Sequence, residues 1–405
     1  MELESRPIDV SHHCGLLIPN IKPLEISNED TLCRASLAGR HAKLYVAADL
    51  SPAEDALKKA TLDVASVMKC FPAVTSEAII LAMAAWYTTL CHIDDAVENL
   101  ESEAAQLALA HAIYILRNAS WCNPPMPGET NHEGDTQDMF MARVLSATVA
   151  YCSRLQDLLP CTVQSKLRAA SIDTLDALAL EHKWRHRSSI NESAYLSIRT
   201  KTIGVTPFFL LVRYNFDHDS SFLTQNVELE SLMSDAELAI GLQNDLIGLS
   251  RDIEKGERFN YILRLESPSL DEREARTLKA VNIHNNAIRS ATATWENLKA
   301  GSGASAQACA DSLMKFVERH YLWASTSKRY QCHPSGHRQL PQKSRLSLLV
   351  MRALLAKSSM RKNLGLDVHY PDNGRRKRKA SLQEWTIRME LKQAMRSTKE
   401  TSLAS

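Results

Sequence analysis

The feature that most constrains this chain is a long apolar segment that ends in a cluster of acids. Residues 78–93 are largely apolar and lead directly into Asp94-Asp95-Ala96-Val97-Glu98. The segment predicts a long apolar helix, and on a helix Asp94 and Glu98 share a face because they are four positions apart. Carboxylates this close repel each other unless a cation lies between them. Because hard divalent cations take oxygen ligands, the cluster indicates either a Mg²⁺ site or a solvated, acidic helix end.

A second polar pattern lies later in the chain, after another helical run. Asn244, Gly248 and Asp252 follow one another at intervals of four residues, so they share one helix face over about 12 Å. An amide oxygen and a carboxylate on that face can hold a second cation. Arg251 lies beside them, where a group that binds phosphate is expected.

Together the two patterns resemble the metal motifs of class I terpene cyclases, in particular the fungal-type sesquiterpene synthases. In that family the second motif reads Asn-Asp-x-x-Ser/Thr-x-x-x-Glu. Arg199 lies 45 positions before Asn244, where this family carries a diphosphate-sensing arginine. Arg329-Tyr330 matches the Arg-Tyr pair near the end of the cyclase domain, and Trp323 precedes it where similar cyclases carry an active-site aromatic residue. The resemblance covers about residues 50–332.

The resemblance implies an all-α fold, the class I terpenoid synthase helical bundle around a deep apolar active-site cavity. Its implied metal positions are Asp94, Asp95, Glu98, Asn244, Gly248 and Asp252. Its implied diphosphate-binding residues are Arg199, Arg251, Arg329 and Tyr330. Its implied catalytic residues are Arg199, Thr202, Ile203, Gly204 and Trp323.

Two positions depart from the family pattern. Gly248 replaces the usual hydroxyl residue and supplies no metal-binding side chain, and Asp252 is one methylene shorter than the usual Glu. A water molecule can take the vacant coordination position, because Mg²⁺ keeps several waters. The alternative is a site that has decayed and binds metal poorly.

The implied reaction is ionisation of an isoprenyl diphosphate followed by cyclisation of the allylic cation, with release of diphosphate. The resemblance implies three Mg²⁺ ions, with Mn²⁺ as a substitute, and farnesyl diphosphate as the substrate of a sesquiterpene synthase. Three alternatives stay open. They are a diterpene cyclase that uses geranylgeranyl diphosphate, a chain-elongating prenyltransferase, and a non-catalytic, decayed cyclase that acts as a binding protein.

The resemblance implies a cyclase domain over 51–332. It leaves an N-terminal, partly extended arm over 1–50 and a C-terminal extension over 333–405 that is expected to be partly helical and partly disordered. Helices are expected over 52–69, 76–98, 101–118, 139–159, 162–187, 192–203, 231–252, 270–299 and 306–330, with a loop at 119–137. Gly204 and Pro207 predict a break after the helix that carries Arg199. The basic cluster at 183–187 reads as a solvated helix end.

Composition argues against several classes of partner. The formal net charge is +1, so no overall charge favours nucleic acid or an anionic membrane. Nine cysteines without regular spacing indicate reduced thiols rather than a disulfide framework. Neither a signal peptide nor an apolar run of about 18 residues is present, so we expect a cytoplasmic protein without stable membrane insertion. Similar cyclases are often dimers, so a homodimer is one expectation.

Overall fold

The computed structural model describes most of the chain between residues 15 and 327. The described residues are 15–20, 28, 32–118, 136–185, 190–217, 226–264 and 270–327. Arg329, Tyr330, the extension 333–405 and nearly all of the expected loop at 119–137 lie outside the described residues. The three predicted domains therefore stay a prediction.

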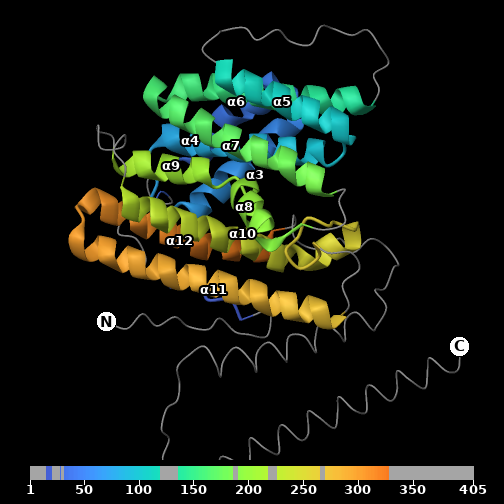
Figure 1. Cartoon of the computed structure of the whole chain (residues 1–405). Helices are drawn as coiled ribbons and strands as arrows, with labels where there is room; N and C mark the ends of the chain where they lie inside the picture. Colours follow the sequence, from blue (N-terminus) through green and yellow to red (C-terminus); the bar gives the residue numbers. More distant parts are fainter. Residues whose placement is uncertain are drawn as a thin grey trace, which may run out of the picture. The chain divides into compact units, whose positions relative to one another are not determined.

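Every regular element within the described residues is an α-helix, and this confirms the all-α fold. The helices are α2 (Arg34–Ala47), α3 (Ala53–Cys70), α4 (Glu77–Val97), α5 (Ser102–Asn118), α6 (Thr136–Leu158), α7 (Cys161–Arg185), α8 (Glu192–Thr202), α9 (Thr206–Phe216), α10 (Val227–Lys255), α11 (Leu270–Gly301) and α12 (Ala304–Thr326). In Figure 1, α5 and α6 lie at one side of the bundle and α11 lies at the opposite side, with α4, α7, α10 and α12 between them. Among these helices, none combines the length and the apolar character that crossing a membrane requires.

The apolar segment identified in the sequence is α4, a central helix of the bundle. It packs against α2, α3, α6 and α9, and its side chains from Ile79 to Trp86 are all buried. A helix that is apolar all round is stable only where other elements cover every face. Ser76 precedes its first turn, as predicted, and the acidic cluster lies at its other end.

The prediction of a partly extended arm is wrong for residues 34–47, which form α2. The helix packs on α3 and α4. The Tyr45 hydroxyl donates to Asp63 Oδ2 at 2.6 Å, and His41 Nε2 lies 2.9 Å from the Thr88 hydroxyl. The residue before the helix, Cys33, makes no capping hydrogen bond, and the first turn carries no acid. Because packing rather than local signals stabilises α2, sequence patterns did not reveal it.

The predicted break lies between α8 and α9. Gly204 has a left-handed backbone with φ of 66°, and the indole N–H of Trp86 donates to its carbonyl oxygen at 2.8 Å. Pro207 falls in the first turn of α9, where its missing N–H costs no helical hydrogen bond. The break is therefore tied to the central helix α4, which carries Trp86.

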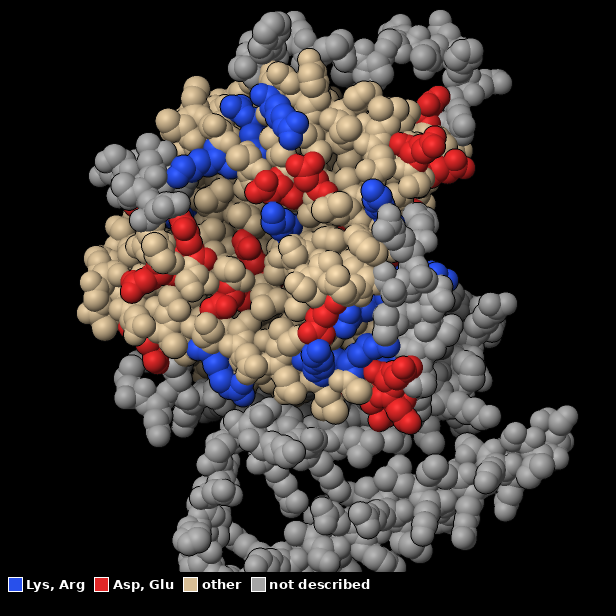
Figure 2. Space-filling view, in the orientation of Figure 1, with Lys and Arg blue, Asp and Glu red and all other residues tan. Residues whose placement is uncertain are grey.

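Acidic and basic side chains are interspersed on one face of the bundle (Figure 2). Figure 2 shows one face, on which red and blue groups alternate among uncharged residues. Neither sign dominates that face.

We predict that Gly204→Ala destabilises the protein. An added Cβ would lie 2.4 Å from Leu90 Cδ2, and the left-handed backbone alone costs a non-glycine residue about 1–2 kcal/mol. Urea unfolding measures the change. The matched control is Gly39→Ala within α2, where nothing lies within 4 Å of an added Cβ. Alanine there should stabilise the helix by about 0.5–1 kcal/mol. Equal effects of the two substitutions would contradict the strained break.

A second prediction concerns pH and Glu237, which accepts a hydrogen bond from the Thr206 hydroxyl at 2.7 Å. Burial raises the pKa of Glu237 from 4.5 to about 7, although that hydrogen bond opposes the shift. The folded protein thus holds the proton of the Glu237 carboxyl group more tightly than the unfolded chain does. The contribution of Glu237 to stability therefore falls as pH rises from 4.5 to 7. Glu237→Gln should therefore gain stability relative to wild type over this range, by urea unfolding at successive pH values. Glu228→Gln, on an exposed position of the same helix, provides the comparison.

Candidate active site

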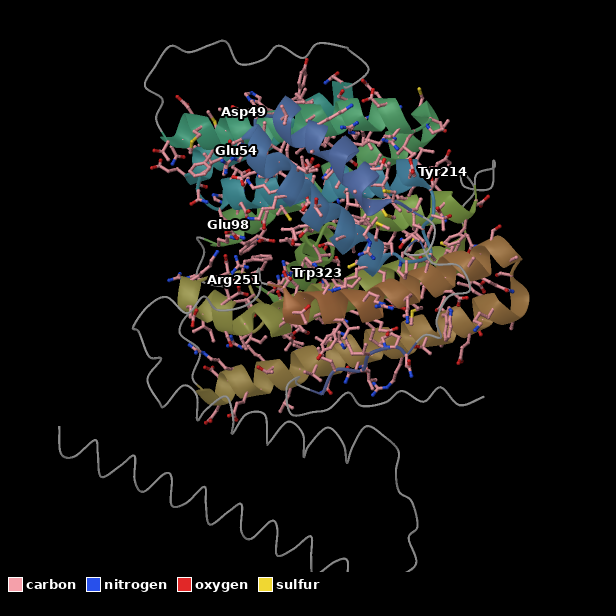
Figure 3. The ribbon with its side chains drawn as sticks, turned by 180° about the vertical axis from the view of Figure 1, so that it is seen from behind. Asp49, Glu54, Glu98, Tyr214, Arg251 and Trp323 are labelled. Carbon is pink, nitrogen blue, oxygen red and sulfur yellow. The ribbon has the colours of Figure 1, made fainter. Side chains whose placement is uncertain are left out.

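One pocket contains most of the residues that the sequence analysis selected. It lies between α3, α4, α7, α8, α10 and α12, beside the break that precedes α9. The predicted residues that line it are Asp94, Glu98, Arg199, Thr202, Ile203, Asn244, Gly248, Arg251, Asp252 and Trp323. In Figure 3, Glu98 and Arg251 lie at one end of the bundle and Trp323 lies nearer its middle.

Four selected residues are not among those lining the pocket. Asp95 is exposed on the outer side of α4. Gly204 lies at the break, but its carbonyl oxygen accepts the hydrogen bond from Trp86. Arg329 and Tyr330 lie outside the described residues. The structure therefore leaves their predicted roles as predictions.

At the acidic end of α4, protein cations lie among the carboxylates. Arg185 Nη2 is 2.8 Å from Glu181 Oε1 and 3.6 Å from both Glu98 Oε1 and Glu257 Oε2. Lys255 Nζ lies 3.8 Å from Glu98 Oε2. Burial, followed by the charge of Asp94, raises the pKa of Glu98. The repulsion that the sequence predicts among these acids is thus offset by protein side chains.

The interpretation of the 183–187 cluster as a solvated helix end is wrong for Arg185. Its side chain is only 17% exposed and lines the pocket. Burial alone would lower the pKa of this guanidinium, but the surrounding carboxylates raise it. The spacing of Glu181 and Arg185, four residues apart on a helix, is a signal that would have indicated the pair.

The second polar pattern faces the pocket from α10. Asn244 Oδ1 is buried and accepts no hydrogen bond from any residue that the structure describes. The Asn260 amide donates to Asp252 Oδ2 at 2.8 Å and to the Asp245 carbonyl at 2.9 Å. Burial raises the pKa of Asp252, and the bond from Asn260 opposes that change. Asn260, which holds the shortened carboxylate in place, was missed because it follows the helix in an irregular segment.

Arg199 is held by a buried ion pair that the sequence analysis did not identify. Arg199 Nη2 lies 2.8 Å from Asp245 Oδ1, and Asp245 is fully buried. The Tyr195 hydroxyl donates to Asp245 Oδ2 at 2.6 Å, and the Tyr261 backbone N–H donates to the same oxygen at 3.3 Å. Burial raises the pKa of Asp245 to about 6, while Arg199 opposes the shift. The arginine is thereby fixed on the pocket wall.

Gly241 on α10 lies against the Arg199 stem. A Cβ on Gly241 would lie 3.4 Å from Arg199 Cγ and 3.6 Å from the Arg199 carbonyl oxygen, which are ordinary van der Waals distances. The helices α8 and α10 therefore pack closely at this point, with space for a small side chain.

The other half of the pocket is aromatic. Phe71 stacks on Phe316 with ring centroids 4.3 Å apart and on Phe208 at 5.5 Å. Tyr87 meets Trp323 edge to face at 6.1 Å. All five side chains line the pocket. One end of the pocket is therefore charged and the other is apolar.

The oxygen donors at the charged end fit a hard divalent cation. Asp94, Glu98, Asn244 and Asp252 line one pocket from two facing helices, and the buried Asn244 oxygen accepts no hydrogen bond within the described part of the chain. The described residues hold no compact group of three His, Cys, Asp or Glu side chains. Mg²⁺ commonly binds one or two carboxylates together with substrate phosphate oxygens.

We predict that Asp245→Asn destabilises the fold by about 3–5 kcal/mol, because it leaves the Arg199 charge buried without its carboxylate. Tyr195→Phe removes one hydrogen bond to the same carboxylate and should cost less, about 1–3 kcal/mol. Urea unfolding of both variants measures the difference. If Asp245→Asn proved as stable as wild type, the ion pair would not support Arg199.

The family model described as terpene synthase family 2, C-terminal metal binding, matches residues 85–290, which include both metal patterns and Arg199. A search of curated protein sequences gives no match.

Solved structures show the same fold at low sequence identity. The linalool/nerolidol synthase from Streptomyces clavuligerus, solved with 2-fluorogeranyl diphosphate, is 16% identical with a TM-score of 0.59, and the match covers 76% of this chain and 99% of that one. The 2-methylisoborneol synthase from Streptomyces coelicolor A3(2), solved with Mg²⁺ and geranyl-S-thiolodiphosphate, is 14% identical with a TM-score of 0.59, and the match covers 82% of this chain and 99% of that one. Because the family model matches slightly more than half of the chain, the protein belongs to terpene synthase family 2 and is a class I terpene synthase, an enzyme that acts on an isoprenyl diphosphate.

Proposed function

We propose that the protein converts farnesyl diphosphate to a sesquiterpene with Mg²⁺ and releases diphosphate. The observation that carries the proposal is the division of one pocket into a charged end and an aromatic end. Asp94, Asn244 and Arg199 lie at the first, and Phe71 and Trp323 lie at the second. An isoprenyl diphosphate has the same division between its head and its hydrocarbon tail.

Asp94, Glu98, Asn244 and Asp252 are the residues that would hold the metal ions. Bound Mg²⁺ supplies positive charge where negative charge develops on the departing diphosphate. Gly248 contributes no ligand, so we expect water in its place. Asp95 stays a candidate only as a neighbour of Asp94, since its side chain is exposed.

Arg199 and Arg251 are the described residues that would bind the diphosphate directly. A guanidinium donates two parallel hydrogen bonds to phosphate oxygens, and these bonds strengthen as the carbon–oxygen bond breaks. The position of Arg199 is set before substrate binds, because it pairs with Asp245, and Tyr195 in turn holds Asp245. Arg329 and Tyr330 keep the same proposed role from the family pattern.

The aromatic half would fold the hydrocarbon chain and exclude water from the cation. Trp323 and the phenylalanine side chains present π faces that stabilise positive charge. Thr202 and Ile203 line the pocket at the helix break, where we propose that they contact the reacting end of the chain. Gly204 would act indirectly, by allowing the break.

Farnesyl diphosphate is proposed because it is the substrate most often used by similar cyclases, and geranylgeranyl diphosphate is the alternative within the class. Two similar structures are described with ten-carbon analogues, so geranyl diphosphate belongs in the test. A chain-elongating prenyltransferase would use isopentenyl diphosphate as a second substrate and give longer linear diphosphates. A decayed cyclase would bind diphosphate poorly, and Gly248 is the residue that favours this alternative.

We predict a cyclic C15 product when the purified protein is incubated with Mg²⁺ and farnesyl diphosphate, analysed by gas chromatography and mass spectrometry. Parallel reactions contain geranyl diphosphate, geranylgeranyl diphosphate, or farnesyl with isopentenyl diphosphate. Asp94→Asn should lower the rate by at least about 100-fold, because it removes a metal ligand. Asp95→Asn should lower it much less, since Asp95 is exposed. Folded protein that releases no diphosphate from any substrate would contradict the proposal.

A further inference from the structure

A buried chain of hydrogen bonds connects the aromatic half of the pocket with a segment near the start of the described sequence. Its members are His320 on α12, Gln243 on α10, and His284 and Asn285 on α11, and we call it the His320–Asn285 chain. All four residues are at least 94% buried. The metal and diphosphate sites do not account for it.

At the outer end of the His320–Asn285 chain, the donor and the acceptor of each hydrogen bond are fixed. The backbone N–H of Leu17 donates to Asn285 Oδ1 at 2.8 Å, and the Asn285 amide nitrogen donates to the Gly15 carbonyl at 3.0 Å. A backbone N–H can only donate and a carbonyl can only accept, so these two bonds settle which end of the Asn285 amide is oxygen. Asn285 Oδ1 is therefore an acceptor for His284.

The donor and acceptor roles fixed at Asn285 determine the roles of the residues that lie nearer the pocket. His284 Nδ1 lies 2.9 Å from Asn285 Oδ1, so it carries the proton and His284 Nε2 is an acceptor. The Gln243 amide nitrogen, 3.2 Å away, donates to it, which leaves Gln243 Oε1 to accept from His320 Nδ1 at 3.0 Å. His320 is thereby fixed as the tautomer with its proton on Nδ1 and a lone pair on Nε2.

The second ring nitrogen of His320, Nε2, is available to the pocket that this residue lines. His320 lines the pocket together with Phe316 and Trp323. The centroid of each of these two rings lies 5.8 Å from the centroid of the imidazole ring. Nδ1 is turned to Gln243, and within the described residues Nε2 has no hydrogen-bond partner. Burial, with a smaller effect from the Arg199 charge, lowers the pKa of His320 to about 3. The imidazole is therefore neutral when substrate enters.

We propose that His320 Nε2 accepts the proton that the cyclised carbocation loses when the product double bond forms. The inference rests on the proposed function and deepens it. In this step a C–H bond next to the cationic carbon breaks, its electron pair becomes the π bond, and the proton moves to Nε2. The imidazolium then gives that proton to the released diphosphate, so the reaction yields an olefin and protonated diphosphate in equal amounts.

Its basicity favours His320 over Cys70, one of the cysteines that line the same pocket. Burial raises the pKa of Cys70 to about 12, so its sulfur holds a proton. A carbocation is so strong an acid that even a weakly basic imidazole can deprotonate it. A neutral imidazole also adds no positive charge to the pocket before the transfer, which a lysine or a protonated histidine would do.

The first test measures the tautomer and needs no substrate. Full-length protein labelled with ¹⁵N-histidine is studied by NMR at pH 7, and the signals of His320 are identified by their loss in His320→Gln. We expect a protonated Nδ1 and an unprotonated Nε2. Asn285→Leu should reverse or mix this tautomer, whereas Asn285→Asp keeps the acceptor oxygen and should preserve it. A protonated Nε2 in the wild type would overturn the inference.

The second test measures how the reaction ends. Diphosphate release and terpene products are quantified in the same reaction with the accepted substrate. In His320→Leu, the share of released diphosphate that yields the wild-type olefin should fall at least about tenfold, with alcohols and other olefins replacing it. Asn285→Leu should shift the products in the same direction although it lies outside the pocket, and Asn285→Asp should not. His41→Gln, which removes another buried histidine on α2, is the matched control and should leave the product ratio unchanged.

The outcomes separate the inference from the proposed function. If the wild type releases no diphosphate, the proposed function fails, and the NMR result still decides whether His320 presents a lone pair. If the wild type is active but His320→Leu keeps the product ratio, the inference is wrong and the function stands. A wild-type product that is entirely an alcohol would also overturn the proposed C–H deprotonation.

Discussion

The buried ion pair between Arg199 and Asp245 is the interaction on which the rest of the site depends. It joins α8 to α10, and the Tyr261 backbone adds the segment that follows α10 to the same carboxylate. Charges can be buried at this depth only when their partners are well placed, since an unpaired charge there is strongly destabilising. The pair therefore fixes the spacing of two helices, and that spacing determines how Arg199 and Asn244 face the pocket.

The charged end of the pocket follows a second constraint, which is that carboxylates must not lie together without cations. Arg185 and Lys255 meet this requirement by their contacts with Glu98, Glu181 and Glu257. A divalent cation that binds Glu98 would therefore compete with Arg185 and Lys255 for its carboxylate. The aromatic end of the pocket is not subject to this constraint. Its rings stack on one another, and the polar groups behind them are joined in the His320–Asn285 chain.

Sequence reasoning was most successful where one local pattern implied one local structure. Asp94 and Glu98 at the end of α4 line the same pocket as the Asn244 pattern, and Gly204 with Pro207 predicted the break between α8 and α9. It failed where the partner was distant. Asp245 has no special spacing to Arg199, and Asn260 holds Asp252 from an irregular segment. The tautomer of His320 depends on backbone groups nearly 270 residues away from Asn285 in the sequence. Helix α2 was missed for the same reason, because its buried polar side chains His41 and Tyr45 find their partners, Thr88 and Asp63, on other helices.

The contact between Asn285 and the segment at Gly15 has a practical consequence for anyone who shortens this protein. The family resemblance begins near residue 50, so a trimmed version would naturally start there. Such a version would lack the two backbone groups that orient the Asn285 amide, together with the helix that carries His41 and Tyr45. Losing these groups would change the orientation of side chains inside the pocket, although none of the removed residues lines the pocket. An N-terminal truncation would then be a poor guide to the enzyme's product, even if the shortened protein folded and released diphosphate normally.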